Sequence, residues 1–460
     1  MNSAREKDHT AYTAYIEGVL LDGTDGMTPQ RGRAVIVRDG KIAAVQPRAE
    51  LLPENCEVVN LHGRYLMPGL INLHVHLNSG GKPSGRKKEP EDYVRLVKLA
   101  TSTPVTRYML RRRIEELASV QLASGVTTIR TVGGISDFDS IVRDRGERFY
   151  GSAAGRSKYS ASARLLPRIL TSNMGISVPG GHVAGSLAYP AATKEEAVRY
   201  VRRIAEDSPD LIKLMITGGI MDAEKEGEPG VLKMPPDMIR AACDEAHALG
   251  LPVASHTEST EGVLAALRGG VDTIEHGAEP TDEMMRLFHE NGAALVTTLS
   301  PVVPLARLDT EVTHVRPMDR ANAEIVLRGI IDCSVRALAE GIPVGLGTDA
   351  GCPFVTQYDM WRELEYFHRY CGVMRHFALH TATLGNARIA GIDGETGSIE
   401  AGKSADMLVT AGNPLEDLRA LQKPEMVVTR GRMLRSPRIK KYGEIDRTLD
   451  ELMREADFGN

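Results

Sequence analysis

Eight short apolar segments alternate with longer amphipathic segments between residues 67 and 392, and this alternation constrains the fold more than any other feature. The apolar segments have the length of strands buried on both faces, and most segments between them show helical periodicity. A strand–helix unit repeated eight times predicts an α/β protein with a (β/α)₈ TIM barrel, and a doubly wound open sheet is the alternative. The predicted strands are residues 69–76, 127–131, 168–172, 211–216, 252–256, 272–276, 294–299 and 343–347.

Segments outside this region read as short strands with Asp-Gly turns before the barrel, and as further strands after it. The sequence therefore predicts a discontinuous small β domain formed by residues 1–66 and 393–460, around a barrel domain of residues 67–392. The clearest barrel helices are predicted at residues 105–122, 194–206, 235–249, 260–267, 281–291 and 321–340. Long substrate-facing loops are predicted at residues 78–103, 141–167, 217–234 and 300–320.

Metal-ligand side chains stand at the carboxyl ends of five predicted strands, where TIM barrels place their chemistry. His74 and His76 share one face of the first strand because alternate residues of a strand point the same way. Two imidazoles on one face make half of a metal site. The other strand-end candidates are Lys213, His256, His276 and Asp349.

Lys213 lies inside the fourth strand, on the same face as Leu211 and Met215. A charged amine in a buried strand is costly unless the charge is lost or paired. One interpretation is a lysine that extends out of the barrel end. The favoured interpretation is that the amine reacts with carbon dioxide to form a carbamate, an anionic bridge for two divalent cations about 3.5–4 Å apart.

Nine stretches that cover nearly the whole chain resemble the amidohydrolase superfamily. The resemblance is strongest to the branch that contains imidazolonepropionase-like proteins and metal-dependent prolidases, the Xaa-Pro dipeptidases. The stretches are LMPGLINLHVHL, SGVTTIRTVGG, PRILTSN, PGGHVAG, LIKLMITGG, VASHTES, DTIEHG, GLGTDAG and GSIEAGKSADMLV.

This resemblance implies two divalent metal ions bridged by the Lys213 carbamate. A hydroxide between the ions would be the nucleophile, and Asp349 would carry its proton to the leaving amine. Zinc is the expected metal, with manganese, cobalt and iron as alternatives. The implied metal ligands are His74, His76, Lys213, His256, His276 and Asp349.

Two further residues have roles that the sequence leaves open. His182, in Pro-Gly-Gly-His-Val-Ala-Gly, matches a loop histidine near the substrate in related enzymes, and is a second catalytic candidate; a solvated loop histidine is the alternative. Arg130 follows the second strand, where it would form either a structural ion pair or a contact to substrate.

The sequence departs from two family patterns. In mononuclear deaminases and imidazolonepropionase, the fifth strand has a His-x-x-Glu pattern. In this chain the acid, Glu258, comes two residues after His256 rather than three. Compared with the glutamate of that pattern, this shift of one residue predicts that the Glu258 side chain faces away from the site. This and Lys213 favour the binuclear hydrolases. Met234 stands where the dipeptidases have a substrate-holding tyrosine, which leaves open whether this chain cleaves Xaa-Pro dipeptides.

Composition excludes several classes of protein. A net charge of -5 gives no indication of nucleic-acid binding, and no apolar run is long enough to span a bilayer. Five cysteines without a Cys-x-x-Cys pair, and a charged first segment unlike a signal peptide, predict a cytoplasmic protein.

The sequence thus predicts a binuclear metal-dependent amidohydrolase that cleaves an amide bond of a dipeptide (Xaa-Pro-like) or an N-acyl amino acid. Cyclic amide hydrolysis, as by imidazolonepropionase, or deamination is the alternative. A non-catalytic scaffold is disfavoured because all six ligand positions are filled. The expected partners are a small-molecule or dipeptide substrate and further copies of the chain, with no nucleic acid and no membrane.

Overall fold

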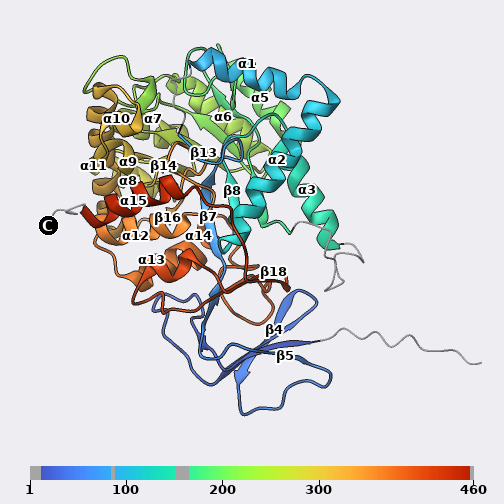
Figure 1. Cartoon of the computed structure of the whole chain (residues 1–460). Coiled ribbons are helices and arrows are strands. Elements are labelled where there is room, and N and C mark those ends of the chain that lie inside the picture. Colours follow the sequence, from blue (N-terminus) through green and yellow to red (C-terminus); the bar gives the residue numbers. More distant parts are fainter. Residues whose placement is uncertain (1–11, 84–88, 152–164, 456–460) are drawn as a thin grey trace, which may run out of the picture.

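The predicted TIM barrel is present in the computed structural model, which describes residues 12–83, 89–151 and 165–455 (Figure 1). Parallel ladders run from the first strand to the third and from the third to the eighth. The eighth strand returns to the first through a parallel bridge between Val75 and Ala350, so the sheet is closed rather than open. The barrel strands are β7 (Leu70–Val75), β8 (Val126–Thr131), β9 (Arg168–Thr171), β10 (Gly175–Ser177), β12 (Ile212–Met215), β13 (Val253–Thr257), β14 (Thr273–His276), β15 (Ala294–Thr297) and β16 (Val344–Leu346).

The third barrel strand is divided into β9 and β10. β9 pairs with β8, and β10 pairs with β12. Asn173, between the two halves, has a φ of 53°, a left-handed conformation that interrupts an extended strand. A short strand, β11 (Ala188–Pro190), adds to the outer edge of β10. The segment 178–187, which contains His182, lies between β10 and β11 and is held near the carboxyl end of this strand.

Helices surround the barrel, and all six predicted ones are confirmed to within a few residues of their ends. α5, α7 and α8 begin after Thr193, Ser259 and Thr281, whose side-chain oxygens each accept a hydrogen bond from a first-turn amide. α11 begins four residues earlier than predicted, at Pro317, because proline is favoured in a first helical turn. These helices are α2 (Pro104–Ala123), α5 (Lys194–Ala205), α6 (Pro236–Ala248), α7 (Thr260–Gly269), α8 (Asp282–Asn291) and α11 (Pro317–Ala339).

All four predicted long loops contain helical segments, so they are shorter than predicted: three contain α-helices, and residues 217–234 contain the 3₁₀ helix η1 (Ile220–Asp222). α1 (Pro90–Thr101) lies in the first, α3 (Phe138–Gly151) begins before the second, and α9 (Val302–Arg307) and α10 (Thr310–Thr313) lie in the fourth. α9 and α10 have only six and four residues, too few to give a clear helical periodicity. Residues 84–88 and 152–164 of these loops lie outside the described residues, as does the first segment of the chain.

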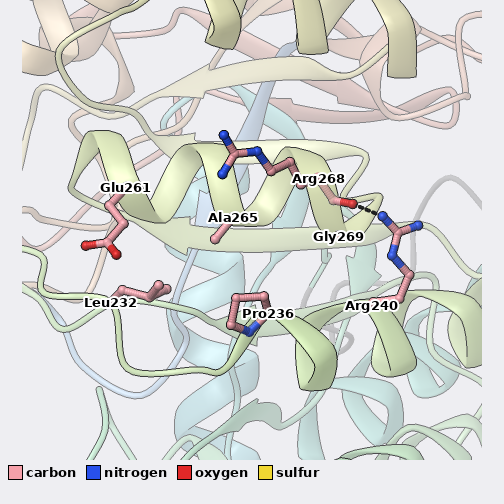
Figure 2. A pocket seen from close by; sticks show the side chains of 7 residues that line it. All are labelled: Leu232, Pro236, Arg240, Glu261, Ala265, Arg268 and Gly269. Carbon is pink, nitrogen blue, oxygen red and sulfur yellow. Dashed lines mark hydrogen bonds between the residues drawn. The ribbon is translucent and has the colours of Figure 1, made fainter.

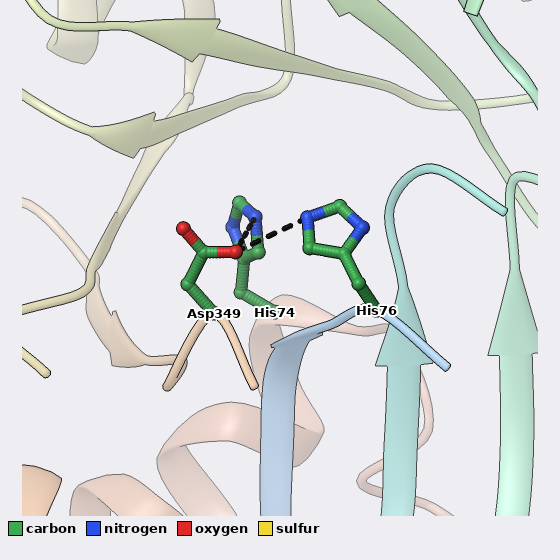
Figure 3. A group of neighbouring side chains, drawn as sticks. All are labelled: His74, His76 and Asp349. Carbon is green, nitrogen blue, oxygen red and sulfur yellow. Dashed lines mark ion pairs between the residues drawn. The ribbon is translucent and has the colours of Figure 1, made fainter. Parts of the chain in front are cut away.

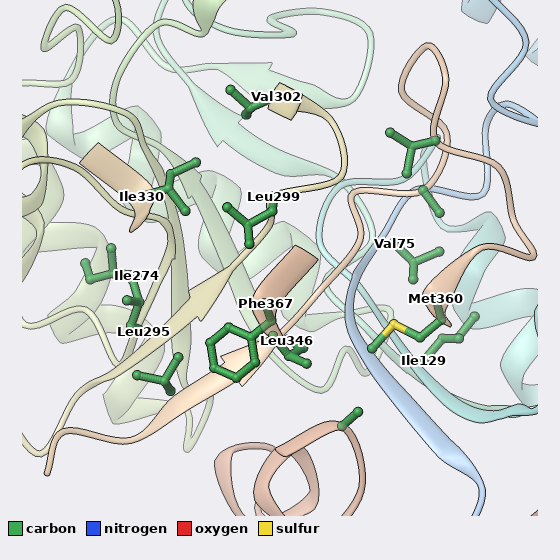
Figure 4. Packing of buried hydrophobic residues seen from close by; sticks show 14 of the residues in the cluster. Val75, Ile129, Ile274, Leu295, Leu299, Val302, Ile330, Leu346, Met360 and Phe367 are labelled. Carbon is green, nitrogen blue, oxygen red and sulfur yellow. The ribbon is translucent and has the colours of Figure 1, made fainter. Parts of the chain in front are cut away.

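The core lies inside the barrel wall and between the wall and the helices. Figure 4 shows Leu295 and Leu346 of adjacent strands beside Phe367 of α12 (Met360–Tyr370), and all three side chains are fully buried. Burying a side chain of this size contributes about 1.5–3 kcal/mol. This packing makes the strands a rigid base for the loops at their carboxyl ends.

Two small sheets lie at the end of the barrel opposite to α1 (Figure 1). The first joins β1 (Thr13–Ile16), β3 (Arg33–Arg38), β4 (Lys41–Pro47) and β5 (Glu57–Asn60). The second joins strands from both ends of the chain, as predicted, and β17 (Met407–Thr410) pairs antiparallel with β6 (Tyr65–Pro68). The remaining strands of the second sheet are β2 (Val19–Leu20), β18 (Met426–Thr429) and β19 (Arg432–Arg435).

The last helix, α15 (Gly443–Glu455), packs on the barrel, where Asp450 forms a 2.7 Å ion pair with Arg362 of α12. The domain boundaries 66/67 and 392/393 stay a prediction. No disulfide joins the five cysteines, all of which lie in the described part of the chain, and the cytoplasmic location also stays a prediction. Among the described residues, no helix is both long and apolar enough to cross a membrane.

Candidate metal centre

His74, His76 and Asp349 meet at the carboxyl end of the barrel (Figure 3). His76 Nε2 lies 3.1 Å from Asp349 Oδ1, and His74 Nε2 lies 3.6 Å from the same oxygen. The Asp349 amide donates a hydrogen bond to the His74 carbonyl, which fixes the loop after β16 beside β7. Asp349 has a φ of 56°, a left-handed conformation that aims its side chain back over the barrel. These are the three residues that were predicted to bind the more buried metal.

His256 and His276 form a second group with Glu258, and the potential ligand atoms of all three lie within 4.8 Å of one another. His256 Nε2 faces the Gly218 carbonyl, which leaves Nδ1 facing His276 Nε2 at 2.8 Å. Two ring nitrogens that face each other in a buried site suit a divalent cation, which accepts a lone pair from each.

The prediction that Glu258 faces away from the site is wrong. Residues two apart on a strand share a face, so Glu258 lies on the side of His256, whereas the prediction takes its position from the glutamate of the His-x-x-Glu pattern. Burial, aided by Asp222 and Asp349, raises the pKa of Glu258 to about 8, and its Oε2 has no hydrogen-bond partner among the described residues. A carboxylate in this state is a group that a cation would stabilise.

Lys213 projects from β12 into the same region and is fully buried. Its Nζ has no hydrogen-bond partner among the described residues. Burial lowers the pKa of Lys213 to about 8, so on the order of a tenth of the amine is neutral at pH 7. A neutral amine is the form that attacks carbon dioxide, and the unsatisfied buried nitrogen fits a carbamate bound to metal.

Glu275 and Arg130 support His74 from inside the barrel. His74 Nδ1 donates to Glu275 Oε2 at 2.8 Å, and Arg130 Nη2 donates to Glu275 Oε1 at 2.7 Å. Burial opposes the charge of Glu275, but Arg130 and His74 hold its pKa well below the ordinary value. Burial lowers the pKa of His74 to about 4, so a neutral imidazole presents Nε2 to the centre. The ion-pair interpretation of Arg130 is therefore confirmed, and Glu275 is a residue that sequence reasoning missed.

His182 lies against the second group. Its ring stacks on His256 with a centroid distance of 4.2 Å, and its Nδ1 donates to Asp222 Oδ2 at 2.5 Å. The Gly219 amide donates to the same oxygen at 2.8 Å. A side chain at position 219 would lie only 3.0 Å from His182 Cε1, so the close approach of the loop requires glycine there. Asp222 was not predicted, and the role of His182 in contacting substrate stays a prediction.

A cavity of about 130 Å³ adjoins this loop. Its wall includes Gly218, whose carbonyl faces His256, and Asp222, which holds His182. Met234 is fully buried in the core, and its neighbour Lys233 lines the cavity instead. The lining residues are Gly218, Gly219, Asp222, Ala223, Glu224, Lys225, Glu228, Gly230, Val231 and Lys233.

A larger cavity, of about 230 Å³, lies between the outer helices α6 and α7 (Figure 2). Pro236 and Ala265 form its apolar wall, and an Arg240 side chain that donates to the Arg268 carbonyl closes one end. None of the candidate metal ligands lines it, so its position separates it from the chemistry of the barrel end.

Comparisons with known proteins agree with this geometry. The Amidohydrolase family model matches residues 65–434. The crystal structure of a prolidase candidate from Bifidobacterium longum is 35% identical, covers 96% of this chain and 99% of its own, and has a TM-score of 0.82. The structure of an Xaa-Pro dipeptidase with bound methionine is 26% identical, covers 92% and 100%, and has a TM-score of 0.76. Ochratoxinase from Aspergillus niger is 26% identical over 95% of this chain and 89% of its own length. The chain belongs to the amidohydrolase family, and the predicted resemblance is confirmed.

Proposed function

We propose that this enzyme is a binuclear metal-dependent hydrolase that cleaves the amide bond of a dipeptide or an N-acyl amino acid. One observation carries the proposal: Lys213 is buried beside two groups of metal-ligand side chains, and its Nζ has no hydrogen-bond partner among the described residues. A lone buried ammonium would be repelled by any cation there. A carbamate would instead supply the anion that two cations need between them.

Six side chains would hold the metals, as the sequence predicts. Two bound divalent ions would supply hydroxide at neutral pH, since coordination lowers the pKa of water to about 7, and would polarise the amide carbonyl. The ring of His256 and that of His276 present facing nitrogens, and Glu258 is a further candidate ligand. The donor set, rich in imidazole, suits zinc.

Asp349 is the proposed proton carrier. It lies within reach of His74 and His76, and its loop is fixed by backbone bonds to β7. A carboxylate in this place can accept a proton from the attacking water and donate it to the leaving amine. His182, held by Asp222, is placed to orient the substrate on the side of the second group.

The substrate class is proposed from the cavity and from the relatives. Lys233 is half-buried in the cavity beside His182 and lies near Asp222. An amine so placed can pair with the carboxylate of a dipeptide or an N-acyl amino acid, which a neutral cyclic amide lacks. The related structure of an Xaa-Pro dipeptidase supports amide-bond cleavage.

Cyclic amide hydrolysis or deamination is the second candidate, and the position of Glu258 favours it. A buried carboxyl with its pKa raised to about 8, next to two imidazoles, is suited to proton transfer. This candidate predicts one metal per chain, with ring opening or release of ammonia in place of release of an amino acid.

Metal analysis combined with a substrate panel tests the proposal. Protein expressed with zinc should carry close to two divalent ions per chain, and should release amino acid from N-acyl amino acids or Xaa-Pro dipeptides. Release of ammonia, or ring opening of cyclic amides, by a one-metal enzyme would favour the second candidate.

Lys233→Met tests the carboxylate contact. The Michaelis constant should rise about tenfold or more while kcat changes little, since the contact is the same in the ground state and the transition state. Lys225→Met is the matched control, because Lys225 lines the same cavity but pairs with Glu228 at 3.4 Å. Equal effects of both variants would contradict a specific role for Lys233.

A further inference from the structure

α1 and the first half of α2 present an unusual apolar surface to solvent. α1 has no buried side chain, and its Leu99 is 63% exposed. Val105, Tyr108 and Met109 at the start of α2 are 58–68% exposed. We call the following set the apolar face: Leu96, Leu99, Val105, Tyr108 and Met109. These side chains are 47–68% exposed, and the Arg111 guanidinium lies 5.1 Å from the centroid of the Tyr108 ring.

The size of the apolar face points to a protein partner. Its exposed apolar area is on the order of 500 Å², near the upper end for the largest patch on a monomeric protein. A stable protein–protein interface buries about 800 Å² on each partner, part of it a polar rim. The apolar face would therefore supply the apolar centre of such an interface.

Charges along α1 are complementary to a second copy of the same helix. The first turn carries Glu91 and Asp92, and Arg95 and Lys98 follow toward the other end. Glu91, Arg95 and Lys98 form a stripe beside that of Leu96 and Leu99, because residues three or four apart share a helix face. Neither Glu91 nor Lys98 forms an ion pair with a described residue.

We propose that the apolar face is the interface of a two-fold symmetric homodimer in which α1 packs antiparallel to its copy. A two-fold axis brings the same patch of both subunits together, so an interface must be complementary to itself. Antiparallel pairing places the acidic first turn of one α1 against the basic second half of the other, twice in each dimer.

The interface would lie next to the mouth of the metal centre. α1 lies at the end of the molecule opposite to the small β sheets (Figure 1). Val94 of α1 packs against the segment with His182: a side-chain atom added at Gly185 would lie 3.2 Å from Val94 Cγ2. Dimerisation would therefore hold α1 on that segment.

Sedimentation velocity of the full-length, metal-loaded protein tests the interface. The wild type should sediment with twice the chain mass. Leu99→Glu combined with Tyr108→Glu should give a folded monomer with the secondary structure of the wild type, because both side chains are exposed. Leu51→Glu is the matched control, since Leu51 is 94% exposed in the loop before β5, and this variant should stay dimeric. A monomeric wild type, or a dimer that survives the double substitution, would overturn the proposal.

Charge reversal tests the antiparallel arrangement separately. Glu91→Lys or Lys98→Glu alone should raise the dimer dissociation constant about tenfold, and the double variant should restore it. A double variant as weak as either single one would overturn the antiparallel pairing. Vesicles of anionic phospholipid distinguish a membrane: their binding by the wild type and not by Leu99→Glu would assign the face to a lipid surface and overturn the dimer.

Discussion

Lys213 is a potential cation placed among groups that are suited to bind cations. In the folded protein its amine is buried, its pKa is lowered to about 8, and its Nζ has no hydrogen-bond partner among the described residues. Such a group destabilises the fold unless its chemistry changes. Carbamate formation removes the positive charge and creates two oxygen ligands, so a single modification resolves both the burial and the repulsion.

Lys213→Ala should therefore lose most activity and most affinity for one of the two metals. A small carboxylic acid, such as propionate, should partly restore both, because it replaces the missing bridging anion. Metal analysis and turnover with and without the acid measure the effect. Lys423→Ala, at an exposed lysine outside the site, is the control and should be unaffected by the acid. Full activity in Lys213→Ala would end the carbamate proposal.

Asp349→Asn separates metal binding from proton transfer. The amide keeps the shape and one oxygen but cannot accept the proton, and general acid–base catalysis is typically worth about 10²–10⁴-fold. We expect a kcat loss of that order with at least one metal retained. The acidic limb of the kcat profile should also flatten. If the variant has normal metal content and near wild-type kcat, a group other than Asp349 carries the proton, and His182 is the first candidate.

The position of a site residue relative to the end of its strand decides whether the sequence could identify it. His74, His76, Lys213 and His256 lie within or just after regular strands, where alternation fixes the face. Glu258 lies beyond the end of β13. Glu275 and His276 are adjacent, yet both side chains reach the site: Glu275 accepts a hydrogen bond from His74, and His276 is a candidate ligand. This is possible because the backbone turns at His276, which has a φ of 72°. Such turns depend on tertiary contacts, and a local pattern does not encode them.

The barrel was predictable for a related reason. Most of the strands are short, largely apolar runs that are buried on both faces, and each main helix has a clear cap or periodicity. α1 was missed because none of its side chains is fully buried, so its sequence lacks a clear core-facing stripe. The division of the third strand was also missed, since it depends on the left-handed conformation of Asn173.

Glu363 connects two elements and gives the stability of the protein a pH dependence. It lies on α12, and its carboxyl accepts hydrogen bonds from the Leu299 and Ser300 amides after β15. Burial outweighs these bonds and raises its pKa from 4.5 to about 7. Between pH 4.5 and 7 the Glu363 carboxyl is therefore protonated in the folded state and ionised in the unfolded chain. The stability from the neutral carboxyl is fully present below pH 4.5 and is lost as the pH rises through 7.

Glu363→Gln should remove this dependence, because the amide does not titrate. As the pH rises from 4.5 to 7, the free energy of unfolding of the wild type should fall relative to that of the variant by up to about 3 kcal/mol. Urea unfolding at several pH values measures it. Glu365→Gln on the same helix is the control. A difference that stays constant with pH would show that Glu363 has the same pKa in the folded and unfolded states.

At the scale of the whole molecule, the proposed metal ligands connect distant parts of the barrel. They lie on β7, β12, β13 and β14 and on the loop after β16, so they come from five of the eight strand positions. The strands that carry these ligands are distant in the sequence, and they contact one another mainly through the sheet of the barrel. Bound metal would add a second set of connections at the carboxyl end of the barrel, which stabilises the folded state relative to an unfolded chain that lacks the site.

Removal of the metals should therefore lower the melting temperature by several degrees while the secondary structure is retained. A ligand present at 100 times its dissociation constant stabilises a protein by about 2.7 kcal/mol, and two such sites stabilise it by more. Calorimetry before and after chelation, followed by readdition of zinc, measures the change. Lys213→Ala should show a smaller loss on chelation, since it already lacks the bridge between the metals. An identical melting temperature with and without metal, in protein shown to bind two ions, would mean that the barrel is held by its apolar core alone and that the ligands are preorganised by Arg130 and Glu275.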